Sequence, residues 1–342
     1  MKIIILTNNK GFFGQMFQPW EGVDLENIED LLAARYDVER MTFFEVVNRD
    51  SKVFNNAFVL YSSSQQMEYK EYILDALMYI EQLGAILLPS LNMLKSHENK
   101  GFQELHKKLV GVKSLNGIYA ARFDEIECED LKLPLIYKDL NGSGSDGVSL
   151  VKNIESIKKL SFSDECFLSR TQLSLFKSRL KAATLKVIGI PKSINNYGDY
   201  FAKQNRFILQ EYIDRLSYDY KVIIFADRYY ILKRYVEKGD FRASGSGLFE
   251  HISEINEGLL YFCKNMFIKF NEPFLALDVC EKLGKHYLIE YQGIHFGPYT
   301  VIKSKGYFKY DETSSWKYIL SKSNLEENIC DAVNLYIERN AL

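Results

Sequence analysis

The chain has 342 residues, which at about 150 residues per domain suggests two or three domains. Its 43 Lys and Arg against 45 Asp and Glu give a formal charge of −2, which excludes a generally basic nucleic-acid binder. Hydrophobic residues make up 47% and charged residues 26%, which is typical of a globular protein and not of a disordered one. No run reaches the roughly 18 apolar residues of a membrane span, so we expect no membrane partner. The five scattered cysteines form no Cys-x-x-Cys pair, which favours a cytoplasmic location over a disulfide framework or a zinc site.

The first hundred residues alternate between apolar runs and helical patterns. Strands are predicted at 3–6, 57–61 and 85–89, with one helix after a capping Asp24 and another over 69–83. This order predicts a small parallel α/β domain. Because ligands of such sheets lie at the carboxyl ends of the strands, Ser62 to Ser64 form a candidate substrate loop, with an ordinary polar turn as the alternative.

Beyond residue 100 the apolar runs come in pairs that predict antiparallel hairpins. The pairs are 135–140 with 148–151, 220–225 with 229–236, and 274–280 with 286–292. Helical patterns are seen at 173–185 and at 325–337, and the second is expected to pack on the body of the protein. The predicted fold class is therefore α/β plus α+β.

A glycine-rich loop, 142–147, formally matches G-x-G-x-x-G but precedes a strand-like run and not the helix of a dinucleotide-binding motif. It therefore resembles a flap whose backbone N–H groups can close over phosphates, with a surface hairpin as the alternative. Lys138 lies on the apolar strand that leads into the loop, and a phosphate held under the loop would compensate its charge. The alternative is that Lys138 lies on a solvated face of the strand.

The second hairpin is predicted with a two-residue turn at Asp227 and Arg228, which places Lys221 opposite Arg234. A bound anion would relieve the repulsion between the two cations, and Asp219 would point to the same face. In the third hairpin, a turn centred on Gly284 places Asp278 directly across from Glu290. Two adjacent carboxylates repel unless a cation bridges them, and hard oxygen ligands favour Mg²⁺. The alternative for both hairpins is a solvated face with ordinary surface charges.

Taken together, the motifs from about Lys100 to Pro298 resemble the ATP-grasp superfamily, and within it the ribosomal-protein glutamate ligases and D-alanine–D-alanine ligases. The run from Lys233 to Ser244 (KRYVEKGDFRAS) is particularly similar to the glutamate ligases. The resemblance implies an N-terminal α/β (pre-ATP-grasp) domain at 1–96, a small lobe with the glycine flap at 97–209, and a C-terminal lobe with the metal site at 210–342.

The resemblance also implies roles for individual residues, with ATP and Mg²⁺ as cofactors. The nucleotide-binding residues, with Lys221 added from the hairpin argument, are Lys100, Lys138, Gly142, Ser143, Gly144, Gly147, Gln210, Glu211, Tyr212, Ile213, Asp219 and Lys221. Arg234 and Arg242 match catalytic cations, and Asp278, Glu290 and Gln292 match the metal ligands, although Gln292 replaces the usual Asn.

The implied activity is an ADP-forming carboxylate–amine ligase that forms an amide or peptide bond through an acyl phosphate. The implied partners are a small-molecule carboxylate and an amine, and a homodimer is left open. Two alternatives remain: an ATP-grasp phosphotransferase acting on a small molecule or glycan precursor, and a non-catalytic nucleotide-binding protein. His295 could contact the acceptor or could be structural.

Overall fold

The computed structural model describes residues 1–13, 23–49, 51–112, 114–140, 147–161, 205–311 and 315–340. The chain divides into two compact units. The first contains the described residues of Met1–Asn116 and Ile213–Leu342, and the second those of Gly117–Leu140 and Gly147–Tyr212. The three-domain division at residues 96 and 209 stays a prediction.

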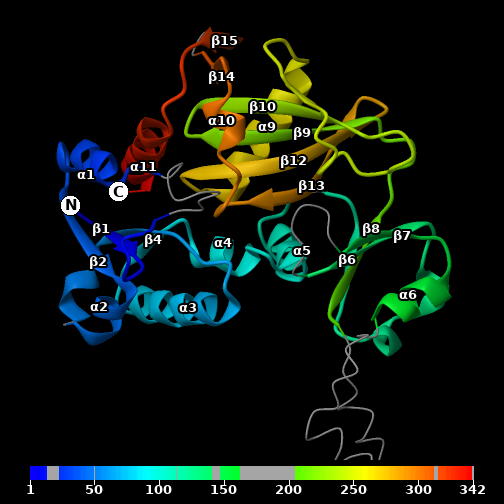
Figure 1. Cartoon of the computed structure of the whole chain (residues 1–342), viewed down its shortest axis with the longest axis horizontal. Helices are drawn as coiled ribbons and strands as arrows, with labels where there is room; N and C mark the ends of the chain where they lie inside the picture. The colour runs from blue at the N-terminus through cyan, green and yellow to red at the C-terminus, as the bar shows by residue number, and fades with distance from the viewer. Residues whose placement is uncertain are drawn as a thin grey trace, which may run out of the picture. The chain divides into compact units, whose positions relative to one another are not determined.

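The first unit begins with a parallel four-stranded sheet in the order β2-β1-β3-β4 (Figure 1). Its strands are β1 (Lys2–Thr7), β2 (Asp37–Thr42), β3 (Phe58–Tyr61) and β4 (Ile86–Leu88). Its helices are α1 (Leu25–Ala33), α2 (Phe43–Asn48), α3 (Met67–Gln82), α4 (Leu91–Ser96) and α5 (Lys100–Leu109), with a 3₁₀ turn at Ser51–Phe54. The predicted parallel α/β domain is confirmed; β2 was missed because its sequence, DVERMT, is a mostly polar edge strand.

Both faces of this sheet are buried, which explains its continuous apolar strands. Ile4 and Leu6 face a core with α2 and α3, whereas Ile3 and Ile5 face a core with α1 and α11 (Leu325–Asn340). The predicted cap is present, because the side chain of Asp24 accepts a hydrogen bond from Asn27 N at 3.2 Å.

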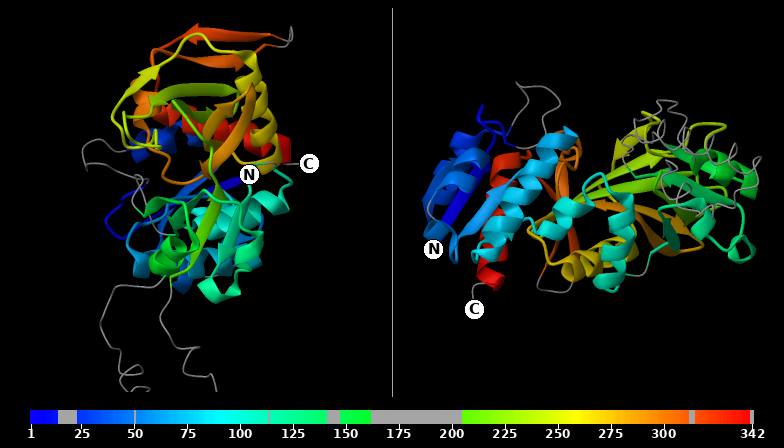
Figure 2. Two further views of the ribbon diagram at one scale, coloured as in Figure 1. Left: turned by 90° about the vertical axis from the view of Figure 1, so that its right-hand side faces the viewer. Right: turned by 90° about the horizontal axis from the view of Figure 1, so that it is seen from below.

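The C-terminal helix α11 lies beside α1, as both views in Figure 2 show. Glu326 Oε1 accepts from Asp24 N at 2.9 Å, and Arg35 Nη1 donates to Glu338 Oε1 at 3.1 Å. The prediction that this helix packs on the body is confirmed. None of the described helices has the length and apolar character needed to cross a bilayer.

The rest of the first unit is a seven-stranded antiparallel sheet with the path β13-β12-β9-β10-β14-β15, in which β11 also pairs with β10. Its strands are β9 (Tyr218–Phe225), β10 (Arg228–Tyr235), β11 (Phe249–His251), β12 (Phe274–Lys282), β13 (Lys285–Gln292), β14 (Gly306–Tyr310) and β15 (Trp316–Leu320). The helices α9 (Glu257–Phe270) and α10 (Tyr299–Ile302) complete it. One face packs on α9 through Val222, Leu275 and Leu277.

The predicted register of the β9–β10 hairpin is wrong. The turn is at Ala226 and Asp227, so Phe225 pairs with Arg228, and Lys221 lies opposite Leu232 and not opposite Arg234. Arg234 pairs with Asp219 instead. No repulsion between opposed cations therefore needs an anion to relieve it. Asp219 and Lys221 do lie on the same face, as predicted.

The β12–β13 hairpin carries a β-bulge that the sequence analysis missed. Leu283 and Gly284 form the turn, and the register shifts between Asp278 and Val279. The shift brings Leu288 into the core with Val279, whereas Tyr287 and Ile289 are only partly buried. It also sets Glu290 opposite Asp278, whereas an unbroken ladder from this turn would set Ile289 there. Bulges re-aim side chains in this way next to functional sites.

The second unit is an antiparallel four-stranded sheet in the order β5-β8-β6-β7. Its strands are β5 (Gly117–Ala120), β6 (Leu135–Asp139), β7 (Val148–Val151) and β8 (Phe207–Glu211), with helix α6 (Ile154–Ser161) and 3₁₀ turns at Phe123–Glu125 and Cys128–Asp130. The first predicted hairpin is confirmed as β6–β7. The helix expected at 173–185 lies outside the described residues. One parallel sheet followed by two antiparallel sheets confirms the predicted fold class.

Glu272 lies in the link between α9 and β12, and burial raises its pKa from 4.5 to about 7. Its carboxylate accepts hydrogen bonds from Ser90 N at 3.0 Å and from Ser90 Oγ. Because the folded state holds this proton more tightly than the unfolded state, the stability contributed by the protonated form is lost as pH rises from about 4.5 through 7.

We therefore expect Glu272→Gln to remove this part of the pH dependence. Relative to the variant, the wild type should lose on the order of 3 kcal/mol of unfolding free energy between pH 4.5 and 8. Urea denaturation of both proteins across this range measures the difference. A constant difference between the two proteins at every pH would contradict the assignment.

Candidate functional site

A row of charged side chains crosses the antiparallel sheet of the first unit. Asp278 on β12 pairs with Glu290 on β13 at one side and with Lys221 on β9 at the other. The facing of Asp278 and Glu290 is confirmed, although it depends on the bulge as well as on the turn. The same face continues into the apolar core through Ile223 and Ala276. The charges therefore occupy the polar end of a face that is otherwise buried.

Arg234 on β10 lies opposite Asp219 on β9 and reaches this row with its side chain. Its Nε and Nη2 donate to the two oxygens of Asp219 at 2.7 and 2.8 Å, and Nη2 lies 3.1 Å from Asp278 Oδ2. This is a bidentate pair whose planar geometry matches a carboxylate. We call Asp219, Lys221, Arg234, Asp278 and Glu290 the charged cluster.

The charges of the cluster shift one another's pKa values. Burial disfavours the charged form of Arg234, but Asp278 and Asp219 outweigh it and raise its pKa. Burial lowers the pKa of Lys221 against the effect of Asp278. Burial also disfavours the charged form of Asp219, which is only 4% exposed, and so raises its pKa, although Arg234 acts in the opposite direction. Three carboxylates against two cations leave an excess of negative charge that a divalent cation would compensate.

The donors at this site fit Mg²⁺ by their chemistry. Asp278 and Glu290 supply hard carboxylate oxygens from adjacent strands, and Gln292 lies two residues beyond Glu290 on the same face. Within the described parts of the chain, no three His, Cys, Asp or Glu side chains form a metal-binding group. A magnesium ion would therefore need Gln292 or ligand oxygens besides the two carboxylates.

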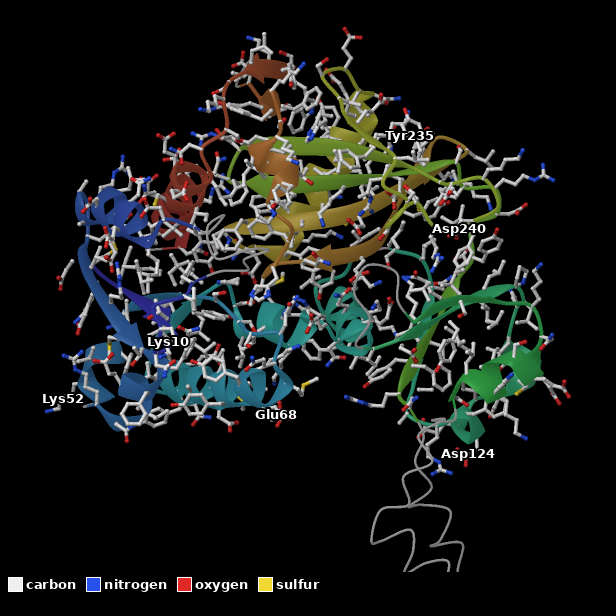
Figure 3. The ribbon with its side chains drawn as sticks, viewed as in Figure 1. Lys10, Lys52, Glu68, Asp124, Tyr235 and Asp240 are labelled. Atoms are coloured by element: carbon white, nitrogen blue, oxygen red, sulfur yellow. The ribbon has the colours of Figure 1, made fainter. Side chains whose placement is uncertain are left out.

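The other predicted residues of the first unit lie on separate elements. Lys100 is the first residue of α5, is 7% exposed, and follows Asn99, whose side chain accepts from Phe102 N at 3.1 Å. Ile213 is buried in a small cluster with Leu115 and Cys280. Arg242 lies in the loop after β10 and pairs with Asp240, with Nη2 2.8 Å from Oδ2. Figure 3 labels Asp240 and also Tyr235, the last residue of β10.

The second unit holds the remaining described residues of the predicted nucleotide set. Lys138 is 7% exposed on β6, and Gln210 is 2% exposed on β8 beside the exposed Glu211. Tyr212 follows β8 directly. Gly147 closes the glycine loop with φ of +70°, and a Cβ there would lie 2.7 Å from Asp139 Oδ2, so both conformation and space require glycine. Gly142, Ser143 and Gly144 lie outside the described residues.

Two groups of polar side chains meet in the fold, and of their members only His295 was a candidate from the sequence. The hydroxyl of Tyr291 lies 2.7 Å from both Ser96 Oγ and His106 Nδ1, which holds the strand residue between Glu290 and Gln292 against α4 and α5. The rings of His97 and His295 meet with centroids 4.6 Å apart. No local signal could have found these pairs, because their members are far apart in the sequence.

Comparisons with known proteins give structural matches only. No family model and no curated protein matches the chain. The ATP-grasp ligase PsnB, solved with the precursor peptide PsnA2 and AMPPNP, is 11% identical over 98% of both chains, with a TM-score of 0.52. The macrocyclase MdnC from Microcystis aeruginosa, solved with the precursor peptide MdnA, is 10% identical over 98% of this chain and 99% of its own, with a TM-score of 0.51.

A D-alanine–D-alanine ligase from Bacillus anthracis is 15% identical over 99% of this chain and 96% of its own, with a TM-score of 0.48. At such low identities, the matches to PsnB and MdnC show the fold and nothing finer. The parallel sheet, the two antiparallel sheets and the near-complete coverage of PsnB and MdnC agree with the resemblance found in the motifs. The chain has the ATP-grasp fold.

Proposed function

We propose that the protein is an ATP- and Mg²⁺-dependent carboxylate–amine ligase that forms an amide or peptide bond through an acyl phosphate. The observation that carries the proposal is the placement of Asp278 across from Glu290, beside Lys221 and Arg234, in an ATP-grasp fold. PsnB is an ATP-grasp ligase that has also been solved with Mg and ADP, and this structure matches the chain with a TM-score of 0.50.

In the proposed reaction, a substrate carboxylate oxygen attacks the γ-phosphorus of ATP, and ADP leaves. The amine nitrogen then attacks the acyl carbon, phosphate leaves, and the nitrogen loses a proton. Asp278, Glu290 and Gln292 would hold Mg²⁺, which would neutralise and orient phosphate oxygens. The reaction needs no protein nucleophile, so the chain contributes positioning and charge.

The cations have separate parts in this proposal. Lys221, fixed on β9 beside Asp278, lies where a phosphoryl group next to the metal ligands would develop charge. Arg234 keeps Asp219 and Asp278 in place through its paired hydrogen bonds and adds positive charge. Lys100 and Lys138 are proposed phosphate-binding residues, and residues 210–213 are proposed to read the adenine. Arg242, whose guanidinium pairs with Asp240 in the loop after β10, is proposed to meet the substrate carboxylate.

An ADP-release screen with Mg-ATP tests the function. Pools of amino acids, short peptides and sugar acids are tested with and without an amine, and products are identified by mass spectrometry. We expect ADP, free phosphate and an amide in equal amounts when the right acid and amine are both present.

The same screen separates the alternatives. A product that retains the phosphoryl group, with no amide, would show a phosphotransferase. Binding of ATP without turnover on any pool would support a nucleotide-binding protein in which Gln292 replaces the usual metal-ligating Asn. Either result would overturn the ligase proposal.

A further inference from the structure

A cavity of about 510 Å³ lies in the first unit at the carboxyl ends of β1 and β3. Its walls come from the residues that follow these strands, from the start of α3 and from His295 in the loop after β13. A volume of roughly 300–1,000 Å³ is typical of a small-molecule site. We call it the serine–amide pocket, after the lining residues Asn8, Ser62, Ser63, Ser64, Gln65 and Gln66.

The lining of this pocket is polar but uncharged. Hydroxyl and carboxamide groups form one part, and the rings of Phe12, Phe43 and Tyr69 form another. Among the described residues that line it, none carries a formal charge near neutral pH, because burial lowers the pKa of His295 to about 4. A charged ligand would be poorly compensated here, since an ion removed from water needs a partner of opposite charge.

Ser63 Oγ, a buried polar atom of the pocket, lacks a hydrogen-bond partner within the described parts of the chain. The ring nitrogen Nε2 of His295 lies 3.3 Å from Ser62 Oγ, which fixes the ring beside the serines. Buried polar atoms are nearly always hydrogen-bonded, so Ser63 Oγ leaves one unmet hydrogen bond at the pocket wall, whereas the serines hold the His295 ring, because the Ser63 backbone also hydrogen-bonds to it and raises its pKa against burial.

The pocket adjoins the charged cluster through the loop after β13. The Cβ position of Gly297 lies 3.8 Å from Lys221 Nζ, and His295 is two residues away, a chain distance of at most about 7 Å. One end of this short loop, at His295, therefore lines the pocket, and the other end, at Gly297, lies beside Lys221 of the charged cluster. A molecule in the serine–amide pocket would have its near end within reach of the proposed phosphoryl-transfer site.

We propose that the serine–amide pocket binds an uncharged polyhydroxylated ring, a neutral sugar unit that carries the acid or the amine of the reaction. Hydroxyl groups of such a ring both donate and accept, as the serine and amide side chains do, and its apolar face can pack on Phe12 or Tyr69. A peptide offers only one backbone donor and one acceptor per residue, which matches this dense group of partners less well. The role as substrate rests on the proposed function; the binding of the sugar does not.

Ligand binding without nucleotide tests the proposal. Glucose, galactose and N-acetylglucosamine are the neutral probes, glutamate and lysine the charged ones, and glycylglycine amide the peptide probe, each followed by saturation-transfer NMR. We expect at least one sugar to bind, with its Kd raised five- to tenfold by Ser63→Ala and at least threefold by Gln66→Ala, an exposed change that spares the core. Ser321→Ala, on the exposed surface, should leave the Kd unchanged.

The outcomes separate this proposal from the function. Failure of all three sugars to bind, or binding that Ser63→Ala and Gln66→Ala both leave unchanged, would overturn the sugar pocket even if the ADP-release screen finds a ligase. Preferential binding of glycylglycine amide or of a charged probe would overturn it as well. If sugars bind, both variants weaken that binding and no ADP is released in the screen, the sugar pocket is supported and the proposed ligase function is overturned.

Discussion

Replacing Glu290 with Gln is expected to lower ATP turnover on the order of 10²–10³-fold, with almost no loss of unfolding free energy. Glu290 lies directly across from Asp278, so the variant removes one of two adjacent carboxylates and relieves their repulsion. The amide keeps the shape of the side chain but loses the charge that a magnesium ion needs. ADP release with the acid and amine found in the screen, together with urea denaturation, measures both effects.

A matched control for this variant lies on the same hairpin. Glu281 on β12 pairs with His286 on β13, away from the charged cluster, so Glu281→Gln makes the same chemical change without touching the predicted ligands. We expect Glu281→Gln to keep wild-type turnover. If Glu290→Gln also retains turnover, the metal assignment is wrong.

The two charged hairpins show how far the sequence predicts the site. Alternation placed Asp219 and Lys221 on one face of their hairpin, and Asp278 and Glu290 on one face of theirs, because a strand repeats every two residues. That the two pairs share a face follows only from the pairing of β9 with β12. It could not place Lys221 against its partner, because the true β9–β10 pairing differs from the predicted one by two residues, and a two-residue slip leaves every side chain on its face. The turn at Ala226 and Asp227 has no Asn-Gly or Asp-Gly signal to fix the register.

For the β12–β13 hairpin, the predicted facing of Asp278 and Glu290 is correct, but the predicted turn and the unbroken ladder behind it are not. A ladder without a bulge, centred on Gly284, put Asp278 across from Glu290. The true turn is centred half a residue earlier, between Leu283 and Gly284, and the bulge shifts the register so that Asp278 still faces Glu290. A bulge leaves little trace in a single sequence, since it inserts one residue into a pattern that is already short. The consecutive apolar residues Tyr287, Leu288 and Ile289 break strict alternation, and this is the signal that could have indicated it.

The serine–amide pocket was only half predictable. Ser62 to Ser64 follow β3, and the rule that ligands lie at carboxyl ends of parallel strands indicated them. His295 lies in the loop after β13, which belongs to the antiparallel sheet, and its contact with Ser62 spans 233 residues of sequence. Such a contact depends on the packing of the whole first unit, which hydrophobic periodicity does not specify.

Replacing Arg234 with Ala is expected to lower the unfolding free energy by about 3–5 kcal/mol, because it leaves a buried carboxylate without its partner. Asp219 is 4% exposed and takes both of its strong hydrogen bonds from Arg234. Arg242→Ala is the matched control: its pair with Asp240 is more exposed, and its loss should cost less than about 1 kcal/mol.

The pH dependence of the Arg234→Ala defect identifies its cause. Burial already raises the pKa of Asp219, and without Arg234 the pKa should rise further. A raised carboxyl pKa means that the folded state takes up a proton more readily than the unfolded state, so stability is regained as pH falls towards the ordinary carboxyl range. Urea denaturation at pH 5 and pH 8 should therefore show a smaller defect at pH 5. An equal defect at both values would mean that the loss comes from packing of the guanidinium stem and not from an uncompensated charge.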